Sequence, residues 1–115
     1  MKQIAQKVKA SLAANENLVN LIDDRIYWSL GPEKLEAPFV LFDIAEIKGL
    51  SKDRRGHNAI VRCFGSNMDV ASDVYEAVKT VLENARHDFV SGQSGITDDE
   101  FREAVMELNF NLKNI

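Results

Sequence analysis

Residues 38–47, with the sequence PFVLFDIAEI, form a nearly continuous apolar segment that begins at a proline. Apolar side chains occupy both sets of alternating positions: Phe39, Leu41 and Ala45 in one set, and Val40, Phe42 and Ile44 in the other. A strand that is apolar on both faces is typical of the interior of a sheet. We therefore predict a central strand over residues 39–47 that is covered on both faces or lies in an interface.

The next segment, residues 58–64 (NAIVRCF), has the length and composition of a second strand, which predicts a β-hairpin. The connection between the two strands, residues 48–57, is long and basic. It has four positive side chains and one negative side chain, which give a local charge of +3: Lys48, Lys52, Arg54, Arg55 and Asp53. The whole chain has a net charge of −4, so this loop is a basic exception in an acidic protein.

Two helices are predicted before the hairpin. Apolar side chains recur every four residues over residues 2–14 and form one stripe on a helix: Ile4, Val8 and Leu12. A second short apolar turn over residues 18–22 predicts another helix, with Asn15 or Asn17 as its N-cap. This helix is expected to stop at the pair of aspartates that follows.

The clearest helical pattern covers residues 67–85. Its apolar side chains keep helical spacing throughout: Val70, Val74, Ala77, Val78, Val81, Leu82 and Ala85. Ser66 is the predicted N-cap, with Asp69 at the position of a capping box.

Residues 104–113 alternate between two sets of side chains with a period of two, which predicts a half-buried antiparallel strand. Short strands are predicted at residues 26–28 and 88–90, and the rest of 86–100 is polar and rich in turn residues, as in a surface loop. The expected fold is one α+β domain over residues 1–115, with an antiparallel-rich sheet of about four strands and helices on one face. Six side chains are predicted to be buried together: Val74, Val78, Val81, Phe42, Leu108 and Phe110.

The composition fits a soluble globular domain, with 45% hydrophobic and 28% charged residues among 115. No apolar run approaches the roughly 18 residues that span a bilayer, and the N-terminus lacks the apolar core of a secretory signal, so we expect a cytoplasmic protein without a membrane partner. A pI near 5.1 argues against a dedicated nucleic-acid-binding protein. The single cysteine, Cys63, cannot form an internal disulfide, which is compatible with a reducing compartment.

Catalytic and metal-binding patterns are weak. Cys63 could pair with His57 or His87 as a nucleophile and base, but a cysteine in a strand more often behaves as a small hydrophobe, and no glycine elbow or helix N-terminus surrounds it. The acidic clusters lack the spacing of a calcium loop, the two histidines do not complete a zinc site, and the glycines follow no phosphate-loop pattern. We therefore expect no enzymatic activity, no cofactor and no metal.

The order of elements, together with two short motifs, resembles the tail-completion, or tail terminator, proteins of long-tailed bacteriophages and prophages. In that family a helical pair ends in a Gly-Asp-Arg-Ile/Val-Tyr motif, and residues 24–27 match its last four positions. A proline-preceded strand of the form Pro-Tyr/Phe-Val-x-Phe follows, and it is matched by Pro38, Phe39, Val40 and Phe42. Asp23 departs from the family, which usually has glycine there, and the chain ends in a less aromatic segment, residues 111–115.

The resemblance implies a structural protein that forms a ring, commonly hexameric, which caps the tail tube and offers a surface to the head connector. It also implies assembly in the bacterial cytoplasm and a final place in the virion tail. A neck or head-to-tail joining protein is the nearest alternative. A nucleic-acid-contacting or regulatory module that uses the basic loop is a second alternative, which the acidic composition disfavours.

Several residues are candidates for contacts with neighbouring subunits. An aromatic wall of Tyr27, Trp28, Phe39 and Phe42 is expected to fill the core beneath the long helix, with any surplus ring available to a neighbour. The basic loop is expected to meet an acidic patch on another subunit or on the tail-tube protein. The candidate interface residues are Lys48, Lys52, Arg54, Arg55, Trp28, Asp98, Asp99 and Glu100.

Overall fold

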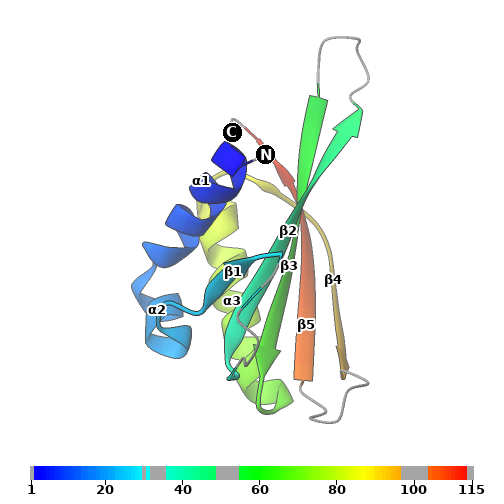
Figure 1. Cartoon of the computed structure of the whole chain (residues 1–115). Helices are drawn as coiled ribbons and strands as arrows, with labels where there is room; N and C mark the ends of the chain where they lie inside the picture. The colour runs from blue at the N-terminus through cyan, green and yellow to red at the C-terminus, as the bar shows by residue number, and fades with distance from the viewer. Residues whose placement is uncertain (1, 30, 32–35, 49–54, 97–103, 114–115) are drawn as a thin grey trace.

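The computed structural model describes residues 2–29, 31, 36–48, 55–96 and 104–113. In this part of the chain, three helices pack on one side of a five-stranded sheet (Figure 1). The elements in chain order are α1 (Lys2–Ala13), α2 (Glu16–Ile22), β1 (Ile26–Trp28), β2 (Phe39–Lys48), β3 (Arg55–Gly65), α3 (Met68–Asn84), β4 (Asp88–Ile96) and β5 (Ala104–Leu112).

The sheet has the strand order β1-β2-β3-β5-β4. Only β1 and β2 are parallel, and the other three pairs are antiparallel. The structure therefore confirms the α+β class and the antiparallel-rich sheet with helices on one face. The sheet has five strands rather than about four.

Strand β4 is longer than predicted, because the sequence predicted only a short strand at residues 88–90 followed by a loop. Its backbone pairs with β5 from Asp88 to Ile96, so the neighbouring strand imposes an extended conformation on a segment with little strand propensity of its own. Close packing requires glycine at position 92, because a Cβ atom there would overlap the Tyr75 hydroxyl group on α3.

The β2–β3 hairpin is longer than predicted. Lys48 pairs with Arg55 and Glu46 with His57, so both ends of the predicted 48–57 connection belong to the ladder. The hairpin arm extends past the rest of the sheet in Figure 1. Residues 49–54, which hold most of the predicted basic loop, lie outside the described residues.

Side-chain caps begin two of the helices. The Asn15 side-chain oxygen accepts a hydrogen bond from the Leu18 N–H at 2.9 Å, which confirms one of the two predicted caps of α2. The cap of α3 is Asn67, which accepts from the Val70 N–H at 2.9 Å, so the prediction of Ser66 was wrong by one residue. The chain before this cap packs so closely against α3 that a Cβ atom at Gly65 would lie 2.5 Å from the backbone nitrogen of Ala71. Position 65 therefore requires glycine.

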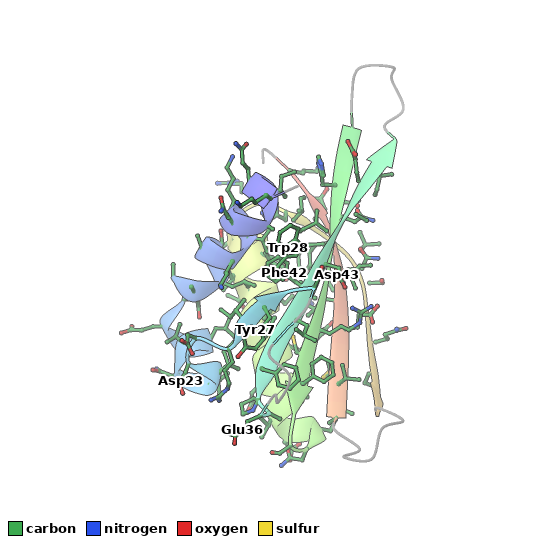
Figure 2. The ribbon with its side chains drawn as sticks, viewed as in Figure 1. Asp23, Tyr27, Trp28, Glu36, Phe42 and Asp43 are labelled. Carbon is green, nitrogen blue, oxygen red and sulfur yellow. The ribbon has the colours of Figure 1, made fainter. Side chains whose placement is uncertain are left out.

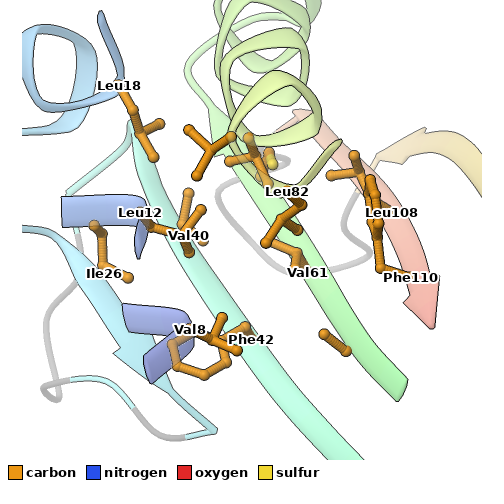
Figure 3. Packing of buried hydrophobic residues seen from close by; sticks show 14 of the residues in the cluster. Val8, Leu12, Leu18, Ile26, Val40, Phe42, Val61, Leu82, Leu108 and Phe110 are labelled. Atoms are coloured by element: carbon orange, nitrogen blue, oxygen red, sulfur yellow. The ribbon is translucent and has the colours of Figure 1, made fainter. Parts of the chain in front are cut away.

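The hydrophobic core lies between the helices and one face of the sheet (Figure 3). All six residues predicted to be buried together belong to this one cluster: Val74, Val78, Val81, Phe42, Leu108 and Phe110. Helix α3 contributes the valines, and the strands contribute the rest.

The outer face of the sheet is the face opposite the described helices. On β2, Val40, Phe42 and Ile44 are buried toward the helices, whereas Ala45 on the outer face is exposed. All the described helices pack on one side, so in the described part of the chain the prediction that β2 is covered on both faces holds at the buried Phe39 and fails at the exposed Ala45. The alternative, an interface, stays a prediction.

Candidate assembly surfaces

The two motifs of the family resemblance contact each other. Strand β1 pairs in parallel with the start of β2, so that Ile26 lies opposite Val40. The Arg25 side chain reaches across and donates a hydrogen bond from its Nε to the carbonyl oxygen of Pro38 at 2.9 Å. These residues join two segments that are distant in the sequence, so their role in the chain is structural.

The turn before β1 has a backbone conformation that favours glycine at position 23. Asp23 has φ 55° and ψ −126°, and the Arg25 N–H donates to the Ile22 carbonyl oxygen at 3.1 Å. These angles match the first central position of a type II′ turn, which strongly favours glycine. The Asp23 carboxylate lies 3.6 Å from the Arg25 guanidinium, a contact exposed to solvent.

The predicted aromatic wall divides into separate environments. Phe42 is fully buried in the core, as expected. Phe39 is also buried, but it stacks on Phe64 of β3 at 4.5 Å on the outer face, so its predicted place beneath the helix is wrong. Tyr27 is half-buried, and Trp28 is 40% exposed beside Phe42 (Figure 2).

A row of polar side chains crosses the outer face. The Ser29 hydroxyl donates to the Asp43 carboxylate at 2.5 Å, and the Arg62 guanidinium lies 3.0 Å from the same carboxylate. Arg62 also lies 3.3 Å from the Glu107 carboxylate on β5. The row links β2, β3 and β5, and the single Arg62 charge is opposed by two carboxylates, so the middle of this face is neutral to acidic.

Large exposed apolar side chains are present on both edge strands of the sheet and at two other positions. Five such side chains are at least 38% exposed in the described chain: Trp28, Ile47, Met68, Phe89 and Val90. Trp28 lies on the β1 edge, whereas Phe89 and Val90 lie on β4, at the opposite edge. A surface hollow of about 940 Å³ adjoins the start of β4, and its lining includes Arg86, His87, Phe89 and Val90.

The predicted charged contacts are only partly visible. The backbones of Lys48 and Arg55 face each other at one end of β3, while Lys52 and Arg54 lie outside the described residues. Asp98, Asp99 and Glu100 also lie outside, between Ile96 and Ala104. Ile96 pairs with Ala104, and Ala104 pairs with Gly65 at the other end of β3. The segments 49–54 and 97–103 therefore start about 33 Å apart, at 3.3 Å per strand residue.

The candidate nucleophile and bases do not meet. Cys63 is fully buried in the core, and burial raises the pKa of its thiol far above the usual range. His87 accepts a hydrogen bond from the Lys113 N–H at 3.0 Å through Nδ1. Burial lowers the pKa of His87, an effect that the nearby Asp88 carboxylate opposes. His57 faces Glu46 and Leu112 in the sheet ladder.

Metal clusters and membrane-spanning helices are both missing from the described part of the chain. No group of three or more histidine, cysteine and acidic side chains is arranged to hold a metal ion there. None of its helices combines the length and the apolar character that a membrane crossing needs.

The fold has a counterpart among solved structures. It matches a chain solved in the virion of a native gene transfer agent (GTA) particle, with a TM-score of 0.72 and 17% sequence identity. The match covers 90% of this chain and 88% of that chain, so the two share nearly their whole length. At this identity the likeness shows a common fold. No protein-family model matches the sequence, and no curated protein does.

Proposed function

We propose that this chain is a structural tail-completion protein of a phage or prophage, which forms a ring at the end of the tail tube and joins it to the head connector. One observation carries the proposal: a chain of a phage-like virion has the same fold over nearly its whole length. The motif resemblance supports it independently, because the matching residues are those that join β1 to β2.

The chemistry of the surface is compatible with this role. DNA must pass through such a ring, and every phosphate that a subunit neutralises would add salt-dependent affinity and slow its passage. Arg62 on the outer face is already paired with Asp43 and Glu107. The buried Cys63 thiol and the His87 imidazole lie in separate environments, which favours a binding and assembly role over catalysis.

The test is deletion of the gene in its own phage or prophage, with electron microscopy of the particles. Loss of a tail terminator is expected to give tail tubes of uncontrolled length that are not joined to heads. Tails of normal length that fail to join heads would favour the neck-protein alternative. Normal, joined particles would contradict both roles.

The predicted basic loop, residues 48–57, provides a second test, directed at the nucleic-acid alternative. We expect that reversal of both Arg54 and Arg55 to glutamate weakens association with copies of the chain or with tail-tube protein, most visibly at low salt, because charge complementarity mainly sets orientation and association rate. The matched control is reversal of Lys7 and Lys9, which are exposed on α1 and carry the same total charge. A tight, salt-dependent DNA complex that only the Arg54 and Arg55 reversal abolishes would favour the nucleic-acid module instead.

A further inference from the structure

The two edges of the sheet have complementary features. Strand β4 forms one edge, and its nine residues, DFVSGQSGI, contain no proline and no lysine, although a register shift between Phe89 and Ser91 interrupts its ladder with β5. Natural proteins commonly protect an exposed edge with such residues, because its unpaired backbone groups can bind another strand. The other edge is β1, which is three residues long and carries the exposed Trp28 ring.

The strand directions allow the two edges to pair between copies. Strand β1 runs parallel to β2, and each step from β2 through β3 and β5 to β4 is antiparallel. Strands β1 and β4 therefore run in opposite directions within one chain. The sheet twists by about 20–25° per strand pair, so a rotation between two copies that also offsets this twist would bring β4 of one copy antiparallel to β1 of the next.

The ladder register also brings the exposed rings close together. Trp28 lies in the same row as Phe42 and Gly92, whereas Phe89 lies in the row of Ile44. The two rows are two residues apart, so a ladder that continued across the contact in the same rows would make Trp28 of one copy and Phe89 of the next diagonal neighbours at about 7 Å. Trp28 shares the helix-side face with Phe42, and Phe89 contacts Phe110 on that face, so both rings would lie on the same side of a continued sheet.

We propose that the β1 edge of one copy binds the β4 edge of the next, with Trp28 inserted into the hollow beside Phe89 and Val90. The hollow of about 940 Å³ is large enough to receive an indole ring, and the ammonium group of Lys79 lies 4.5 Å from the centre of the Phe89 ring that lines it. The contact is heterologous, so its repetition forms a ring when the rotation between copies closes, and an open filament when it does not. This inference rests on the proposed ring and names the surfaces that form it.

The alternative use of the same surface is an isologous dimer in which β4 pairs with β4 of a second copy. Such a dimer would cover Phe89 and Val90 but leave Trp28 exposed. The heterologous contact covers both exposed patches at once, which is why we favour it.

The test compares native masses of three variants with the wild-type chain. Trp28→Ser removes the ring of the β1 edge, and Val90→Lys places a charge on the β4 edge at a side chain that is 51% exposed. Val90 is preferred to Phe89, because Phe89 contacts the core residue Phe110 at 5.4 Å. Met68→Ser is the matched control, since Met68 is a large apolar side chain of similar exposure, 38%, on neither edge. Circular dichroism and thermal unfolding check that each variant is folded.

Each edge variant is expected to lose assembly and to run as a single 12.9 kDa chain, while Met68→Ser assembles as the wild type does. An equimolar mixture of Trp28→Ser and Val90→Lys is expected to form a dimer, because each variant supplies the edge that the other lacks. The inference is overturned if either edge variant assembles normally, or if the mixture stays monomeric. A wild-type chain that stays monomeric even with tail-tube protein would instead overturn the proposed ring itself.

Discussion

The two faces of the sheet differ although they are built from the same strands. On β2, Val40 and Phe42 point to the helices and are fully buried, whereas Asp43, between Phe42 and Ile44, points outward and joins a polar row. Successive side chains along a strand point to opposite faces, so the two faces of the sheet have different side chains and different roles. The helix-side face stabilises the fold, and the outer face and the edges remain available for contacts with other chains.

The largest predicted effect is at the centre of the helix-side face. Phe110→Ala is expected to lower the free energy of unfolding by about 3–5 kcal/mol, because the ring is fully buried and its removal leaves a cavity. Chemical denaturation measures this change. A loss below about 1 kcal/mol would show that the Phe110 ring is not part of the buried core.

A smaller loss is expected at Cys63, also on the helix-side face. Cys63→Ser places a hydroxyl group in an apolar environment and should cost about 1–3 kcal/mol. Biological activity at a permissive temperature should persist, since the thiol is buried and serves packing. A folded Cys63→Ser protein that fails in a complementation assay would revive a chemical role for the thiol.

A substitution in the turn before β1 is expected to stabilise the protein rather than destabilise it. Asp23→Gly is expected to raise the free energy of unfolding by about 1 kcal/mol, because glycine adopts the positive φ of this position without strain. The exposed ion pair with Arg25 that is lost contributes little. Asp24→Gly is the matched control, and it should not stabilise the protein. An equal change in the free energy of unfolding for both variants would show that the positive φ at Asp23 does not destabilise the protein.

The smallest effect on stability is expected on the outer face. Arg62→Gln removes both ion pairs of the polar row, yet the side chain is 38% exposed, so the loss should stay below about 1 kcal/mol. Thermal unfolding at low and high salt measures the change. A loss as large as that of Phe110→Ala would break the distinction between the two faces.

Periodicity predicted much of the fold, because the residues that recur at fixed spacing are those that the core buries. Val74 and Val78 on α3, and Leu108 and Phe110 on β5, are examples. Strand β4 could not be predicted in full, since Gly92 is extended only through its pairing with β5 and its packing on Tyr75.

The candidate surfaces were less predictable. Trp28 was predicted as an interface residue and is exposed on an edge, but nothing local in the sequence marks Phe89 and Val90 as its counterpart. That relation depends on the strand order, which brings β1 and β4 to opposite edges. The polar row through Arg62 likewise depends on the register between three strands.

The central claim is that one face folds the chain while the remaining surface assembles it. The most direct test is the native mass of the wild-type protein, measured over a range of concentrations, alone and with tail-tube protein. The account predicts a closed assembly of several 12.9 kDa chains, hexameric as the family resemblance implies. A single 12.9 kDa chain under every condition would contradict it.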